Sequence, residues 1–151
     1  MAVATYTASQ VSQVRRLSVG QNVVYSRLEQ AAMTVSDIVL LAQVPNHAIV
    51  TDGYMTVRGV GITTGTWKIG VQGTLVDAIS GATLTSDTLH AGASLTASGI
   101  ARITSSFLPF KVSVSDDAAS QFVWLQATFS AGSGTATQSL AFVMNYLIDR
   151  D

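Results

Sequence analysis

Apolar and polar residues alternate with a period of two through most of the chain from Asn22 onward, and this alternation constrains the fold more than any other feature. In segment 66–74, Trp67, Ile69 and Val71 share one face and polar residues occupy the other. The same alternation recurs in 108–115 and in 140–148. Successive side chains of a β-strand point to opposite faces of the sheet, so these segments are predicted to be half-buried strands.

Further strands are expected elsewhere along the chain. The segment Gln121–Phe129 is apolar on both faces and is therefore expected to lie between two layers or under a partner. Weaker strand patterns cover Val23–Ala31, Asp37–Val44, Ala48–Arg58 and Gly99–Ser105. About eight short strands without a convincing long helix predict an all-β fold, an antiparallel β-sandwich of jelly-roll-like type.

Turn signals separate these segments. Pro45-Asn46 and Asp116-Asp117 each divide two apolar runs, as turn residues do. Gly132-Ser133-Gly134 lies between the last two strands, and a hairpin is predicted there. Residues 78–98 are rich in Gly, Ala, Ser and Thr with weak periodicity, which predicts a long loop that is either functional or a plain surface loop.

The chain has 151 residues, the common size of one domain. We expect an N-terminal arm over residues 1–20 and a β-sandwich domain over residues 21–151. Within the arm, the spacing of Val11, Val14 and Leu17 permits a short helix around Ser9–Leu17, and an extended conformation is equally compatible.

Charged residues make up only 11% of the chain, whereas hydrophobic residues make up 48%. A typical soluble domain has about 25% charged residues, so much of this surface is expected to be covered by partners. The net charge of −1 gives no positive electrostatic field that would attract nucleic acid or an anionic membrane. There is no cysteine, no signal-peptide pattern and no apolar stretch near the ~18 residues of a transmembrane helix, so the protein is expected to be made in the cytoplasm.

No catalytic, cofactor-binding or metal-binding residues are predicted. The two histidines, His47 and His90, lie in expected loops and form no ligand-spaced pair. The nine acidic residues are scattered, and no nucleophile elbow, calcium loop or dinucleotide fingerprint is present. A jelly-roll enzyme with a metal site would need several converging His or Glu ligands, so the chain is predicted not to be an enzyme.

Aromatic residues offer the one alternative to a purely structural role. Those able to line a sugar-binding face are Tyr25, Tyr54, Trp67, Trp124 and Tyr146. Packing in the core is the favoured interpretation for the two tryptophans, because they lie in strands with buried faces. A carbohydrate-binding or receptor-binding module would require Trp67, Tyr54 or Tyr25 to be exposed in a shallow groove.

The order of segments resembles that of capsid decoration (cement) proteins of tailed bacteriophages. The residues that carry the resemblance are Asp37–Pro45, Ala48–Tyr54, Thr66–Val71, the hydroxyl-rich and Gly-rich excursion, Gln121–Phe129 and Ser139–Ile148. The resemblance implies a jelly-roll-like β-sandwich protomer, a homotrimer in the favoured case, located on the virion.

In such a protein the partner would be the major capsid protein. The chain would bind the outer surface of the capsid, stabilise contacts between major capsid proteins, and place residues 1–20 on a neighbouring subunit as an arm. The alternative is a carbohydrate-binding or receptor-binding β-sandwich module of a phage head fibre or tail.

Overall fold

The structure is a computed structural model that describes residues 3, 5–7, 9–13, 22–30, 34–59, 62–94, 98–113, 122–134 and 138–148. The first strands are β1 (Thr5–Thr7), β2 (Ser9–Gln13), β3 (Asn22–Gln30), β4 (Ile38–Pro45), β5 (Ala48–Gly59) and β6 (Ile62–Val71). They are followed by β7 (Leu75–Val76), β8 (Thr83–Leu84), β9 (His90–Ser94), β10 (Ser98–Arg102), the 3-10 turn η1 (Ser105–Phe107), β11 (Phe110–Lys111), β12 (Phe122–Gly134) and β13 (Gln138–Ile148). None of the described residues forms a helix with the length and apolarity needed to cross a membrane.

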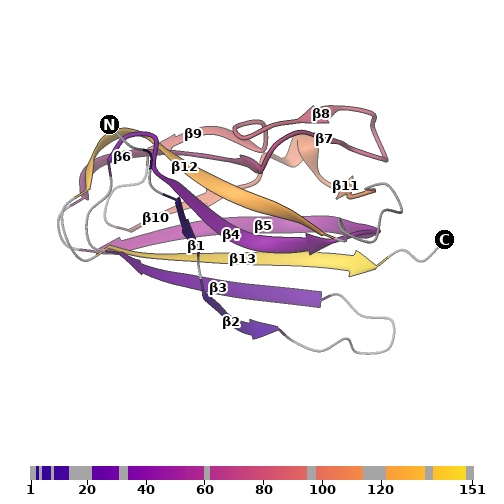
Figure 1. Cartoon of the computed structure of the whole chain (residues 1–151), viewed down its shortest axis with the longest axis horizontal. Helices are drawn as coiled ribbons and strands as arrows, with labels where there is room; N and C mark the ends of the chain where they lie inside the picture. Colours follow the sequence, from indigo (N-terminus) through magenta and orange to yellow (C-terminus); the bar gives the residue numbers. More distant parts are fainter. Residues whose placement is uncertain are drawn as a thin grey trace.

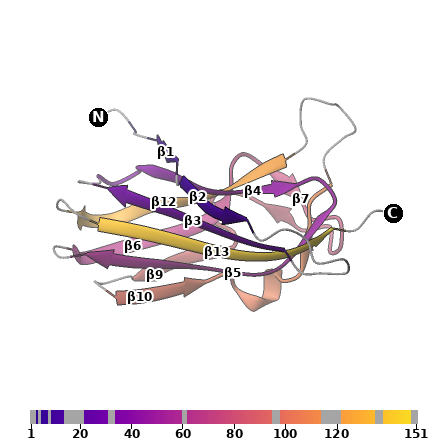
Figure 2. The ribbon, with the colours of Figure 1, turned by 90° about the horizontal axis from the view of Figure 1, so that it is seen from below.

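Two sheets lie face to face and form a sandwich (Figure 1). Sheet A has the strand order β1-β4-β12-β6-β9, and sheet B has the order β10-β5-β13-β3-β2. Viewed from below, sheet B lies in front, with β13 between β3 and β5 (Figure 2). The prediction of an all-β sandwich is confirmed.

Eight of the strands define the topology as a jelly roll. Taken in chain order they are β3, β4, β5, β6, β9, β10, β12 and β13, and the first four pair with the last four in reverse order. The antiparallel pairs are β3–β13, β4–β12, β5–β10 and β6–β9. Folding one long antiparallel ribbon back on itself in this way closes two four-stranded sheets around one core, which is the jelly-roll arrangement.

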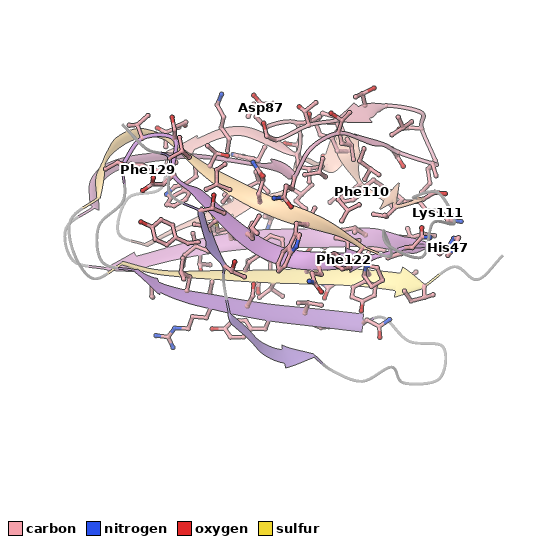
Figure 3. The ribbon with its side chains drawn as sticks, viewed as in Figure 1. His47, Asp87, Phe110, Lys111, Phe122 and Phe129 are labelled. Atoms are coloured by element: carbon pink, nitrogen blue, oxygen red, sulfur yellow. The ribbon has the colours of Figure 1, made fainter. Side chains whose placement is uncertain are left out.

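The core lies between the sheets and is built from the alternate residues that the period of two predicted. Trp67 and Phe129 are directly opposite each other in sheet A, and their ring centroids are 5.1 Å apart. Met55 and Phe142 are paired in the same way in sheet B. All four side chains are fully buried. Figure 3 shows Phe129 and Phe110 at opposite ends of this interior.

The described part of the N-terminal segment adds one strand to each sheet. Strand β1 pairs in parallel with β4, and β2 pairs antiparallel with β3. The alternative of a helix is therefore wrong for Ser9–Gln13, and Val14 to Leu17 lie outside the described residues. The edge of β3 offers unpaired backbone groups, and pairing with these groups outweighs the weak helical spacing.

Residues 78–98 are not the long loop that their composition predicted. They contain β8, β9 and the first residue of β10. Leu84 and Leu89 are buried in the core, so two apolar anchors hold this stretch against the sandwich. Gly70 permits a close approach here, because a Cβ atom at this position would lie 2.1 Å from the backbone oxygen of Thr85.

Two other predicted features differ from the structure. Of the segment 108–115 that was expected to be a strand, the structure describes residues 108–113, and within these only β11 is a strand. It pairs with Ile49 and Val50, beyond the part of β5 that β10 covers. The predicted hairpin at Gly132–Gly134 is wrong, because these residues continue β12 and the next strand, β13, lies in the other sheet. The Asp116-Asp117 turn lies outside the described residues.

Candidate functional site

The two histidines lie in different elements of the fold. His47 lies in the β4–β5 turn with a φ of 66°, as predicted for a loop residue. His90 does not lie in a loop, because it begins β9 and pairs with Ile69. Within the part of the chain that the structure describes, no group of three or more His, Cys, Asp or Glu residues could hold a metal ion.

The described carboxylates bind the protein's own groups. Asp52 forms an ion pair with Arg102 at 3.1 Å, and Asp87 forms one with Lys68 at 3.5 Å. Figure 3 shows Asp87 on the outer side of the molecule near β9. Asp37 accepts a hydrogen bond from the backbone N–H of Thr34. These contacts are typical of structural turns and surface pairs rather than of a general acid or base.

Asp77 is the most strongly connected of these carboxylates. Its Oδ1 accepts hydrogen bonds from the backbone N–H groups of Ile79 and Lys111, and its Oδ2 accepts from the N–H and hydroxyl of Ser80. Burial raises the pKa of Asp77, but the hydrogen bonds from Ser80, Lys111 and Ile79 outweigh it and hold the pKa below the ordinary 3.8. Asp77 therefore ties the β7–β8 turn to β11.

The aromatic residues divide into core and surface groups. Trp67 and Tyr146 are buried in the core. Tyr25 and Tyr54 are half-buried on the outer face of sheet B, and Trp124 is half-buried on the outer face of sheet A. Core packing is thus the observed role of Trp67 but not of Trp124.

The outer face of sheet B carries a shallow hollow of about 330 Å³, which is the candidate functional site. Its floor is the central strand β13, which contributes Ser139, Ala141 and Val143. Val143 is opposite Tyr25 on one side and Tyr54 on the other, so the two tyrosines face each other across β13. Small residues on a central strand between long side chains on its neighbours produce the depression.

The walls of this hollow provide polar and cationic groups. Arg27 from β3 and Thr56 from β5 lie opposite Ala141 on its two sides. Arg102 from β10 is not one of the lining residues, but it lies over the ring of Tyr54, with 5.0 Å between the guanidinium carbon and the ring centroid. Tyrosine and arginine are the side chains that contribute most to binding hot spots, because each joins a large contact area to directed hydrogen bonds.

The lining of the hollow consists of aromatic, hydroxyl-bearing, cationic and small apolar residues. The hollow contains no histidine or carboxylate among its lining residues, and the nearby Asp52 is already paired with Arg102. The sequence marks Tyr25 and Tyr54 as aromatics able to line a binding face but does not place them together. Their proximity depends on the register of both β3 and β5 against β13, which the alternation of residues does not specify.

The fold is a jelly-roll sandwich with additional edge strands, and the outer face of one of its sheets carries a hollow. No protein-family model matches the sequence, and no curated protein matches it significantly. Solved structures do match. A chain of the structure described as "Capsid of Ralstonia phage GP4" aligns with a TM-score of 0.64 and 18% identity, over 98% of this chain and 100% of that chain. A chain of "Cyanophage Pam1 capsid asymmetric unit" aligns with a TM-score of 0.54 and 17% identity, over 90% and 95%.

Proposed function

We propose that this chain is a non-enzymatic structural protein of a phage virion, made in the host cytoplasm and bound to the outer surface of the capsid. There it stabilises contacts between major capsid proteins as a decoration, or cement, protein. The observation that carries this proposal is the alignment of the whole jelly roll with chains of two phage capsid structures. Identities of 17–18% support a common fold, and the functional step rests on the features that follow.

The scarcity of charge supports a partner-covered surface. With 11% charged residues, the chain can bury its faces against a capsid without removing many charges from water. The hollow on sheet B has the side chains of a protein-binding hot spot, and we assign it to contact with the major capsid protein. Tyr25 and Tyr54 would enclose one partner side chain, and Arg27 would contribute a directed hydrogen bond.

The N-terminal segment supports an assembly role in a second way. Strands β1 and β2 are short additions to the outer edges of the two sheets. A short edge strand can pair with a neighbouring subunit as well as with its own, because backbone hydrogen bonds require no particular side chains. We therefore assign residues 1–20 to an arm that contacts a neighbouring subunit, in a homotrimer around a threefold axis.

A receptor-binding module of a head fibre or tail is the second candidate function. The half-exposed Tyr25 and Tyr54 favour it, because they lie in a shallow hollow of the kind that the hypothesis required. The burial of Trp67 counts against it. The two candidates differ in their target, which is the capsid in the first case and a host surface in the second.

Co-sedimentation with empty capsids of the phage that encodes the chain tests the proposal. We expect the full-length chain to sediment with the capsids at a saturating, fixed stoichiometry and to raise their thermal disruption temperature. The double variant Tyr25→Ala/Tyr54→Ala should bind at least about tenfold more weakly. Thr83→Ala, an exposed substitution on β8, is the matched control and should bind as the unmodified chain does. A folded chain that stays in the supernatant would contradict the proposal.

A further inference from the structure

The outer face of sheet A carries an aromatic corner at the beginning of β12. Phe122 and Trp124 are two residues apart on this strand and therefore lie on the same face. Their ring centroids are 6.3 Å apart and their planes meet at 88°. Phe122 is 44% exposed and Trp124 is half-buried. Figure 3 shows Phe122 near the C-terminal end of β4 and the beginning of β12.

Glutamine residues surround Trp124 on this face. Gln43 of β4 is the cross-strand partner of Trp124 and is exposed. Gln72 follows the end of β6, is exposed, and donates its backbone N–H to the carbonyl oxygen of Trp124. Gln126 lies two residues further along β12, and its side-chain amide donates to the hydroxyl of Thr128. Glutamines thus lie next to Trp124 on β4, just after the end of β6, and two residues further along β12.

The corner has little net charge. Along β6, the cation Lys68 is paired with Asp87, and the described residues around Trp124 in register are glutamines and small or apolar residues. Among these described register partners a charged ligand would find no group of opposite sign, so its removal from water would not be compensated by them. A neutral ligand with many hydroxyl groups fits this composition better.

A saccharide unit has the complementary chemistry. The apolar C–H face of a pyranose ring can pack on the ring of Trp124 with its edge against Phe122. Amide groups such as those of Gln43 and Gln72 can both donate to and accept from sugar hydroxyls. Sites for small ligands commonly combine an apolar surface with a few polar groups that fix orientation.

We infer that the corner formed by Phe122 and Trp124, with Gln43 and Gln72 beside it, is a binding site for a neutral saccharide. This activity is independent of capsid binding, because it uses the opposite sheet. On a virion it would hold the particle against a neutral surface polysaccharide. The site is open and small, so a single saccharide unit is expected to bind with a dissociation constant of about 1 mM.

Saturation-transfer NMR with the full-length chain tests this inference. The probes are neutral trisaccharides of glucose, galactose and N-acetylglucosamine, with an anionic heparin trisaccharide for comparison. At least one neutral probe should show saturation transfer, and it should bind more tightly than the anionic probe. Its binding should also change the fluorescence of Trp124, which is distinguishable because the only other tryptophan, Trp67, is fully buried.

Variants locate the site and control for misfolding. Trp124→Ala should lower the affinity at least about tenfold. The exposed substitutions Gln43→Ala and Gln72→Ala leave the core intact and should each lower it about threefold or more. Thr83→Ala, an exposed substitution on β8, is the control and should bind as the unmodified chain does. Absence of saturation transfer from all neutral probes, or unchanged binding by the glutamine variants, would overturn the inference.

Discussion

Gly70 has no side chain, and this allows the stretch between β6 and β9 to pack directly against it. An added Cβ atom would meet backbone atoms of Thr85 and Ser86 at 2.1–2.4 Å, and backbone cannot move aside as a flexible side chain can. We predict that Gly70→Ala lowers the free energy of unfolding by about 3 kcal/mol, measured by urea denaturation.

The matched control for this prediction is Gly73→Ala. A Cβ atom there meets nothing within 4 Å, so only the positive φ of 82° is unfavourable and the cost should be about 1 kcal/mol. If the two substitutions lower the free energy of unfolding equally, the backbone of Thr85 and Ser86 does not pack tightly against Gly70.

Asp77 makes stability depend on pH. Its folded-state pKa lies below the ordinary 3.8, so the folded chain binds a proton less readily than the unfolded chain does. The stabilisation is therefore fully present above pH 3.8 and is lost as the pH falls through the folded-state pKa. The substitution Asp77→Asn should lower the free energy of unfolding by about 2 kcal/mol at pH 7. The reason is that the side-chain nitrogen of Asn cannot accept the two hydrogen bonds that Ser80 donates to Oδ2 of Asp77.

Thermal unfolding at pH 7 and at pH 3 measures this effect. The loss of stability between the two pH values should be smaller in Asp77→Asn than in the unmodified chain. Asp87→Asn, in a surface ion pair, is the control and should change stability by less than about 1 kcal/mol. If Asp77→Asn loses as much stability between pH 7 and pH 3 as the unmodified chain does, the pH dependence comes from other carboxylates.

At the scale of elements, the period of two predicted the strands well and their connections poorly. The segment expected at Ala48–Arg58 is observed as Ala48–Gly59, because each residue's environment alternates along the strand. The hairpin at Gly132–Gly134 was predicted wrongly, since glycines and small residues also occur inside a strand that leaves one sheet for the other. Residues 78–98 were predicted as a loop because their few leucine anchors are not periodic.

The candidate site could be predicted only in part. The sequence marks Tyr25, Tyr54 and Trp124 as aromatics able to line a binding face, but pairing across strands decides what surrounds each of them. Gln43 and Trp124 are 81 positions apart in the chain and become neighbours only through the register of β4 and β12. Local alternation carries no information on that register.

The two N-terminal strands yield a prediction at the same scale. Both lie at sheet edges outside the eight jelly-roll strands, so a chain lacking residues 1–20 should still fold cooperatively. It should lose about 2 kcal/mol of stability, because the partly buried Tyr6 packs against the core. If residues 1–20 are an arm, this chain should also bind capsids more weakly. A truncated chain that cannot fold would show that β1 and β2 are part of the minimal domain.

The whole molecule is expected to form a symmetric oligomer. Light scattering of the purified full-length chain should give three times the 15.8 kDa mass of one chain. A homotrimer would place three copies of each outer face around one axis and so match a threefold position on a capsid. A stable monomer would leave the low charge content unexplained and would favour the receptor-binding alternative.

Capsid attachment is the central claim, and a cryo-electron density map of the capsids after incubation with the full-length chain tests it most directly. We expect jelly-roll density on the outer surface of the capsid, where major capsid proteins meet. The outer face of sheet B, with Tyr25 and Tyr54, should lie against the capsid. A map without added density, or with the chain attached only through a tail or fibre, would contradict it.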